Sequence, residues 1–185
     1  MIRWILAALL AVTLVANCSS DADTPSDTSA ALPGPVPEGV TFRTPPERAP
    51  AAPEFRLNLL DDEVLVAEEQ WSERPMVLVF FESWCELCRQ QQPGINELVE
   101  EYRDIVLFVG VAGMSKEDEL REYVEDNEVA YPVGVDRSGE VWLRYAAEEP
   151  PLVALVSKGG HVLRGWPGGL SPDELRSQIE ELAIA

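Results

Sequence analysis

Apolar residues along the chain fall into short runs separated by polar turns, as in a sheet with intervening helices. The alternating segment 55–59 predicts a strand that turns at Asp61–Asp62 and returns over 63–66 as a hairpin. The continuous run 76–81 (MVLVFF) predicts a strand buried on both faces, and 105–111 predicts another. Shorter strands are expected at 131–135, 152–156 and 161–164, the last two joined by a turn at 158–160.

Three helices are expected between and after these strands, over about 85–102, from Ser115 to about 127, and over 171–183. Ser171 has the features of an N-cap, because a proline follows at the first helical position and acids occupy the first turn. Ser115 stands three residues before an aspartate and predicts a capping box. The order of elements predicts an α/β sheet with helices on its faces.

The first 53 residues differ in character from the rest. Residues 1–17 carry one basic side chain and then an apolar stretch too short to cross a bilayer, which predicts a signal peptide. Residues 18–53 hold 8 of the 15 prolines among Ser, Thr, Ala and Asp, and predict a disordered tether. A random coil of this length would reach ~30–35 Å. The folded domain is therefore expected over 54–185.

Composition narrows the classes of function. The chain carries 33 acidic against 14 basic residues and a formal net charge of −19, which argues against nucleic-acid binding. Three cysteines and one histidine exclude a disulfide-dense mini-protein, and a metal site with four Cys or His ligands would need all four of these residues. The acidity favours a solvated surface, with selection of basic partners as the alternative. His161 is expected on an exposed hairpin, as a surface residue.

The motif that carries chemistry is Cys85-Glu-Leu-Cys88 at the start of the first predicted helix. Two cysteines three positions apart lie within one helical turn, close enough to form a small disulfide ring. The helix dipole and free backbone N–H groups at this end favour the thiolate of the first cysteine. The pair could instead be half of a metal site, which would need further ligands, and the remaining candidates are Cys18 and His161.

Residues 77–88 (VLVFFESWCELC) resemble the active-site strand and helix of the thioredoxin superfamily. Pro93 stands where those proteins carry a proline in the helix, and Pro151 with the strand after it resembles their cis-proline segment. The long separation of Cys85 from Pro151 fits the secreted TlpA/ResA/DsbE-like branch, which has an extra strand–helix insert. Residues 139–145 resemble the extracellular DsbE-like proteins of actinobacteria. The resemblance covers about 55–183.

The resemblance implies a thioredoxin-like fold: a central mixed β-sheet flanked by helices, with an N-terminal β-hairpin and a TlpA-type insert. It implies that Cys85 is a partly exposed nucleophile and that Cys88 resolves the mixed disulfide. Trp84 would shape the docking groove, and Pro151 would present a cis peptide to the substrate. The reaction would be thiol–disulfide exchange with no cofactor besides the Cys85–Cys88 disulfide. We expect a monomer.

Three positions depart from the family pattern. Val79 stands where thioredoxins bury an aspartate, and Glu82 is expected to point elsewhere, which leaves proton handling for Cys88 unassigned. Pro150 precedes the cis-proline and has no N–H, so one docking hydrogen bond, net ~0.5–1.5 kcal/mol, should be missing. The pair Glu86-Leu87 places a carboxylate beside the first cysteine, which opposes thiolate formation against the helix dipole. The sequence does not decide whether the carboxylate or the helix dipole has the larger effect on thiolate formation at Cys85.

The segment Val15-Ala16-Asn17-Cys18 resembles a bacterial lipoprotein cleavage box, in which Cys18 becomes the lipidated first residue. Asn17 departs from that pattern, where Gly, Ala or Ser is usual. Lipidation would hold the protein at the outer face of the cell membrane, and ordinary secretion is the alternative.

The leading interpretation is a membrane-tethered, extracytoplasmic thiol–disulfide oxidoreductase. Its partners would be protein thiols and disulfides, with a membrane thiol donor or oxidase for electron transfer. It would either oxidise secreted proteins or reduce a target such as apocytochrome c. One alternative is a metallochaperone that holds Cu(I) or Zn through the two cysteines. Another is a peroxiredoxin-like peroxidase, but no Pro-x-x-x-Thr-x-x-Cys setting precedes Cys85 or Cys88.

Overall fold

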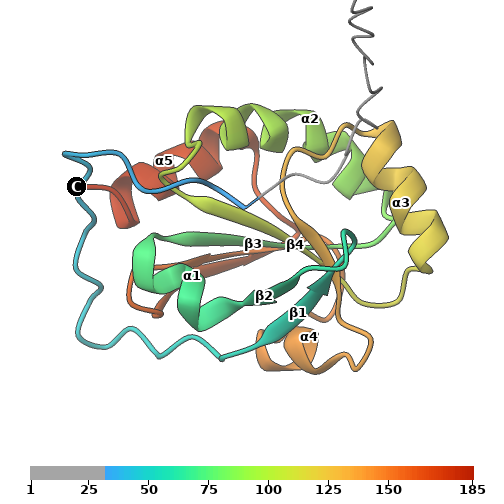
Figure 1. Ribbon diagram of the computed structural model, residues 1–185, viewed down its shortest axis with the longest axis horizontal. Coiled ribbons are helices and arrows are strands. Elements are labelled where there is room, and N and C mark those ends of the chain that lie inside the picture. Colours follow the sequence, from blue (N-terminus) through green and yellow to red (C-terminus); the bar gives the residue numbers. More distant parts are fainter. Residues whose placement is uncertain (1–31) are drawn as a thin grey trace, which may run out of the picture.

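The computed structural model describes residues 32–185, so the predicted signal peptide and Cys18 lie outside the described residues. Its centre is one mixed seven-stranded sheet in the order β2-β1-β5-β4-β3-β6-β7 (Figure 1). The strands are β1 (Arg56–Leu59), β2 (Val64–Val66), β3 (Met76–Phe81), β4 (Leu107–Ala112), β5 (Val133–Val135), β6 (Leu152–Val156) and β7 (Val162–Pro167). The helices are α1 (Ala67–Glu73), α2 (Glu86–Glu101), α3 (Glu117–Asp126), α4 (Glu140–Arg144) and α5 (Pro172–Leu182). The predicted fold class is confirmed.

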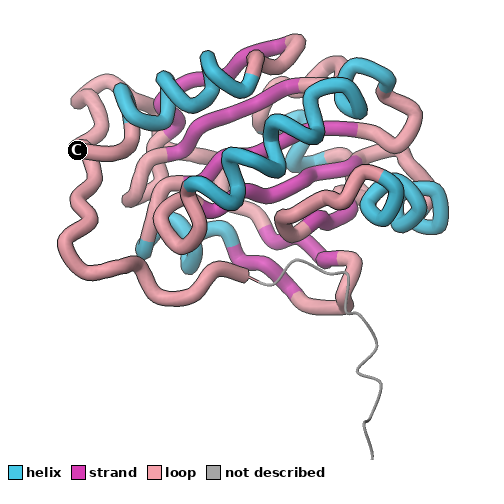
Figure 2. Tube along the Cα trace, turned by 90° about the horizontal axis from the view of Figure 1, so that it is seen from above, coloured by secondary structure: helices cyan, strands magenta, loops and turns pink. Residues whose placement is uncertain are grey.

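Helices cover both faces of the sheet, and two hydrophobic clusters fill the space beneath them. Alternate side chains of β3, namely Val77, Val79 and Phe81, enter the cluster that includes buried residues of α2, α3 and α5. The intervening three β3 side chains enter the second cluster, with α1 and α4. Figures 1 and 2 show α2 and α5 side by side over one face. Gly94 permits this approach, because a Cβ there would lie 2.0 Å from Cγ of Pro172.

Strand β3 occupies the middle of the sheet. It pairs in parallel with β4 and antiparallel with β6, and all six of its side chains are buried. A β-rich apolar run satisfies both faces of such a strand, as the sequence predicts. Helix α2 follows directly, with Cys85 as its N-cap residue and Pro93 inside it. The central strand therefore delivers the two cysteines to the carboxyl edge of the sheet.

The helix ends show one confirmed and one wrong prediction. Ser171 caps α5 in a full capping box with Glu174 and is followed by a proline, as expected. Ser115 does not cap α3, whose N-cap is Lys116 without a side-chain hydrogen bond. The Ser115 hydroxyl instead donates to the buried carboxylate of Glu82, a contact across 33 positions that local spacing cannot reveal.

Two short helices were not expected. Helix α1 follows β2 directly and buries Ala67 and Trp71, which are one turn apart. Helix α4 spans five residues and buries Val141 and Trp142. Each offers too few turns for hydrophobic periodicity to be recognised in the sequence.

Part of the predicted tether belongs to the folded domain. The buried guanidinium of Arg74 donates to the carbonyl oxygens of Gly34 at 2.6 Å and Asp104 at 2.7 Å. The backbone N–H of Gly34 donates to the Asp104 carboxylate at 2.7 Å. This contact holds the described start of the chain beside the amino ends of β3 and β4.

The chain from there to residue 53 runs along the domain rather than away from it, as the blue segment in Figure 1 shows. Arg43 N–H donates to the carbonyl of Ala183 at 3.0 Å, and Ala52 N–H donates to that of Gly160 at 2.8 Å. A proline-rich segment has few N–H groups to satisfy, so a small number of such bonds is enough to hold it extended. The structure thus extends the domain back from the predicted boundary at 54 to about residue 33.

Replacing Arg74 by Met tests this extended boundary. The substitution leaves two carbonyls without their charged donor, which should cost about 2–3 kcal/mol of unfolding free energy and roughly 5–10 °C in Tm. Calorimetry of the whole protein measures this, and tryptic cleavage after Arg43 should accelerate. The exposed Arg56→Met variant is the matched control. Unchanged Tm and unchanged cleavage would show that the segment is not held.

Candidate active site

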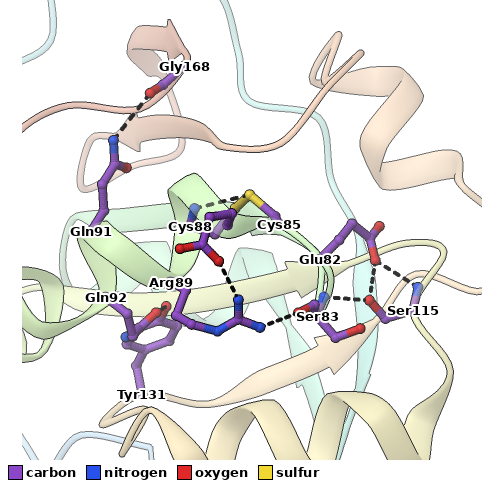
Figure 3. Close-up of a disulfide and its surroundings, with 11 residues drawn as sticks. Glu82, Ser83, Cys85, Cys88, Arg89, Gln91, Gln92, Ser115, Tyr131 and Gly168 are labelled. Carbon is purple, nitrogen blue, oxygen red and sulfur yellow. Dashed lines mark hydrogen bonds and ion pairs between the residues drawn. A yellow bond between two sulfur atoms is a disulfide. The ribbon is translucent and has the colours of Figure 1, made fainter.

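Cys85 and Cys88 form a disulfide at the first turn of α2 (Figure 3), with an S–S distance of 2.00 Å and a Cα–Cα distance of 5.3 Å. The Cys85 Sγ also accepts a hydrogen bond from the backbone N–H of Cys88 at 3.1 Å. In the reduced protein the same N–H and the positive end of the helix dipole would face the Cys85 thiolate. The local fold thus prepares this sulfur to leave or to attack.

The exposure of the two cysteines differs from the expectation. Cys85 is 5% exposed and Cys88 is 4% exposed, so the predicted nucleophile is not markedly more accessible than its partner. Both belong to the hydrophobic cluster that also includes buried residues of α2, α3 and α5. A substrate sulfur must therefore be guided to Cys85 by the residues around it.

Two apolar side chains next to the cysteines in sequence are exposed. Trp84 is 58% exposed and Leu87 is 44% exposed, both beside the cysteines in sequence. The Trp84 side chain also borders a cavity of ≈ 360 Å³ that Ser83, Arg89 and residues of α3 line. The docking role of Trp84 that the resemblance implies stays a prediction.

The peptide between Pro150 and Pro151 is cis, as expected from the resemblance. Pro151 is buried and precedes β6, which pairs with β3 through the register Phe80–Leu152. That register brings the cis-proline segment to the end of β3 that carries the disulfide. Pro150 has no N–H, so this residue can offer a substrate backbone only its carbonyl.

Gln91 connects the active-site helix to the cis-proline segment, a contact that sequence reasoning missed. Its side-chain amide donates to the carbonyl of Gly168 at 3.3 Å (Figure 3). Gly168 N–H in turn donates to the carbonyl of Pro151 at 2.8 Å. Gly168 has φ = 83°, and Gly169 approaches the Gln91 side chain so closely that a Cβ would lie 2.4 Å from its Oε1. Two adjacent glycines in the β7–α5 connection are the sequence signal that accompanies this contact.

The carboxylate between the cysteines is not isolated. Glu86 accepts hydrogen bonds from Gln90 at 3.3 Å and Arg89 at 2.7 Å. These two hydrogen bonds and the charge of Arg89 hold the pKa of Glu86 below its ordinary value. Arg89 also donates to the carbonyl of Ser83, which ties the positive group to the loop before Cys85. The positive charge of Arg89 therefore partly offsets the effect of the Glu86 carboxylate, which disfavours the Cys85 thiolate.

Position 79 offers no proton relay. Val79 is 2% exposed and lies opposite Gly110 and Val153 in the sheet. Glu82 is fully buried, and its carboxylate accepts hydrogen bonds from the 113–115 loop, so it does point elsewhere, as expected. A buried polar pair that the sequence did not reveal lies under α2: Tyr131 donates to Gln92 Oε1 at 2.8 Å. Burial raises the pKa of Tyr131, so this phenol stays protonated and donates.

No group of three or more His, Cys, Asp or Glu side chains within residues 32–185 could hold a metal ion. In the described structure the sulfurs of Cys85 and Cys88 are bonded to each other. His161 lies half-buried on the β6–β7 turn, where its backbone bridges to Ala51. Within the same residues, no helix is long and apolar enough to span a membrane.

Residues 49–165, more than half of the chain, match the AhpC/TSA family. The chain belongs to this family. Among curated relatives, the thiol-disulfide oxidoreductase ResA of Oceanobacillus iheyensis is 26% identical over 137 residues, which cover 72% of this chain and 71% of the relative. DsbF of MTB has a solved structure with 28% identity and a TM-score of 0.65, covering 70% of this chain and 98% of DsbF. The exposed lipoprotein thioredoxin Etrx1 of Streptococcus pneumoniae has 25% identity and a TM-score of 0.62, covering 70% of this chain and 100% of Etrx1.

This AhpC/TSA member is a thiol–disulfide oxidoreductase with a thioredoxin-like fold. The resemblance to the ResA-type branch is confirmed by a relative of that name, and solved DsbE-like structures share the fold. The surroundings of Cys85 agree with this activity, because a second cysteine one turn away completes a dithiol pair.

Removing the negative or the positive charge near Cys85 should shift the pKa of its thiol in opposite directions. Glu86→Gln removes an anion beside the thiolate, which should lower the pKa of the Cys85 thiol and make the disulfide easier to reduce. Arg89→Gln leaves Glu86 unpaired and should raise that pKa. Thiolate absorbance against pH in the reduced protein measures both, with Arg121→Gln on α3 as the control. Shifts of the same sign in the Glu86 and Arg89 variants would contradict the account.

Restoring a backbone donor at position 150 should strengthen docking. Pro150→Thr supplies an N–H for a substrate backbone, so KM for a polypeptide disulfide should fall by up to about tenfold, the equivalent of one hydrogen bond. The rate with dithiothreitol, which has no backbone, should stay unchanged. If the wild type and the Pro150→Thr variant had equal KM values for every polypeptide tested, position 150 would not contact the substrate.

Proposed function

We propose that this protein is a membrane-tethered, extracytoplasmic oxidoreductase that exchanges disulfides with secreted or membrane polypeptides. The observation that carries the proposal is the Cys85–Cys88 disulfide at the amino end of α2, with the cis Pro150–Pro151 segment at the same edge of the sheet. The disulfide would react with a substrate sulfur, and the cis-proline segment would align an extended chain. Together they suit a protein substrate better than a small molecule.

In the oxidising direction, a substrate thiolate attacks Sγ of Cys85 and the Cys85–Cys88 bond breaks. Cys88 leaves as a thiolate, and a mixed disulfide joins Cys85 to the substrate. A second substrate thiolate then attacks the substrate sulfur, so Cys85 leaves as a thiolate that the N–H of Cys88 stabilises. The substrate gains a disulfide and the enzyme gains two electrons, which a membrane oxidase must remove.

The reducing direction uses the same bonds in reverse. The Cys85 thiolate attacks a substrate disulfide, and one substrate sulfur leaves as a thiolate. Cys88 then attacks Sγ of Cys85, releases the reduced substrate and restores the disulfide. A reductant needs a membrane thiol donor, whereas an oxidising exterior favours the first direction. A reduction potential near ~−120 mV would identify an oxidant, and one near ~−270 mV a reductant.

The location is part of the proposal. Residues 1–17 have the composition of a signal peptide, and Cys18 stands at the position where lipidation would occur. Two structural neighbours support an exterior location: one is a secreted disulfide oxidoreductase of Mycobacterium tuberculosis, and the other is an exposed lipoprotein of Streptococcus pneumoniae. Cys18→Ser in the native host should release the protein from the membrane fraction, whereas an unchanged distribution would contradict lipidation.

Trapping the mixed disulfide tests the function directly. Cys88→Ser removes the resolving sulfur, so covalent adducts of Cys85 with host polypeptides should accumulate and disappear on treatment with reductant. Non-reducing electrophoresis and mass spectrometry identify the attached chains. The Cys85→Ser variant is the matched control and should trap far less. Equal adducts in both variants, or stoichiometric metal on the purified wild type in place of the disulfide, would contradict the proposal.

A further inference from the structure

A buried carboxylate lies just before the active-site cysteines and is not part of the exchange reaction. Glu82 is 0% exposed and follows the last residue of β3. Its Oε1 accepts hydrogen bonds from the N–H groups of Gly113 at 2.9 Å and Met114 at 2.7 Å. Its Oε2 accepts from the N–H of Ser115 at 2.7 Å and from the Ser115 hydroxyl. All four partners are donors from one loop, residues 113–115.

The same residues join this loop to the active-site loop (Figure 3). Ser115 Oγ accepts from the N–H of Ser83 at 2.8 Å, and the carbonyl of Glu82 accepts from the N–H of Cys85 at 3.0 Å. We call Glu82, Ser83 and Ser115 the carboxylate clasp. It fixes the connection between β4 and α3 against the three residues that lead into the disulfide.

The clasp holds the backbone of Met114 while its side chain remains in solvent. Met114 is 73% exposed, although its N–H donates to a fully buried group. Within residues 32–185, five large hydrophobic side chains are exposed, and three of them lie in the two clasped loops or at the start of α2: Trp84, Leu87 and Met114. Exposed apolar side chains on loops that flank a reactive disulfide are typical of a contact surface.

We propose that Met114 is a specificity-determining residue, and that Glu82 and Ser115 are positioning residues that present it to the substrate. The preferred substrate is a polypeptide with an apolar side chain next to the reacting cysteine, which Met114 would cover from one side. A thioether on an unbranched stem adapts to differently shaped apolar partners. The inference rests on the proposed exchange function and adds a substrate preference to it.

Two disulfide peptides that differ only beside the cysteine, with Leu or Ser at that position, test the preference. For the wild type we expect kcat/KM to be about tenfold higher with the Leu peptide. Met114→Gln keeps the length of the side chain but makes it polar, and should remove most of this ratio. Met114→Leu keeps the side chain apolar and should retain the ratio of the wild type. Val64→Gln, an exposed apolar position on edge strand β2, is the control and should leave the ratio unchanged.

The clasp is tested through Ser115, because changing Glu82 itself would leave buried donors unpaired. Ser115→Ala should lower the preference for the Leu peptide and raise KM, while the rate with dithiothreitol stays within about twofold. Ser115→Thr keeps the hydroxyl and should rescue the preference. A clasp with a merely structural role would lower Tm without changing the ratio of the two peptides.

Three outcomes would overturn the inference: equal kcat/KM values for the two wild-type peptides, an unchanged ratio in Met114→Gln, or an equal loss with peptide and dithiothreitol in Ser115→Ala. A wild-type protein that fails to react even with dithiothreitol would contradict the proposed function itself. The two failures are therefore distinguishable in one set of assays.

Discussion

The site depends on the register of strand β3 with its two neighbours. In that register Phe81 lies opposite Ala112 of β4, and Phe80 lies opposite Leu152 of β6. The disulfide, the 113–115 loop and the cis-proline segment follow or precede these positions directly, so they meet at one edge of the sheet. A shift of one residue would place every β3 side chain on the opposite face, and the two hydrophobic clusters exclude that alternative.

Exposed apolar and acidic side chains lie close together near the disulfide, since Trp84 borders a cavity that Glu119, Glu122 and Asp126 also line. The formal charge of the protein is −19, yet Trp84 and Leu87 beside the cysteines and Met114 in the 113–115 loop are exposed. The carboxylate of Glu86 between the cysteines is engaged by Arg89 and Gln90, and that of Glu82 is buried under four hydrogen bonds. Arg89 thus balances the charge of the exposed Glu86, and burial removes Glu82 from the surface that a substrate meets. An acidic protein can in this way receive a neutral or apolar polypeptide segment.

The central strand and the cysteine pair could be predicted because each is encoded within a few neighbouring residues. The run 76–81 fits a strand buried on both faces, and the spacing of Cys85 and Cys88 fits one helical turn. The cis peptide at Pro151 came from the resemblance to thioredoxins, since no local pattern of residues distinguishes it. Ser115 was misassigned because its position three residues before an aspartate matches a helix cap, while its actual partner lies 33 positions away.

The linker was misjudged for a related reason. Its composition is typical of disorder, but its partners, such as Asp104 for Gly34 and Ala183 for Arg43, are 70 and 140 positions away in the chain. Composition reports how much apolar surface a segment can bury, and a segment with few N–H groups can be held by polar contacts alone. The buried Arg74 is the clearest example, because an arginine in the sequence gives no sign of whether its guanidinium will bind backbone carbonyls.

The position of that contact also constrains the geometry of the tether proposed above. Gly34 is held beside Arg74 and Asp104, which precede β3 and β4, whereas the disulfide follows the carboxyl end of β3. Six residues of strand separate the two edges by about 20 Å. Sixteen positions separate Cys18 from Gly34, so the chain between them can span at most about 55 Å. In a lipidated protein the disulfide would therefore lie on the side of the domain away from the point where the tether joins it. Polypeptides could then reach Cys85 without passing between the domain and the membrane.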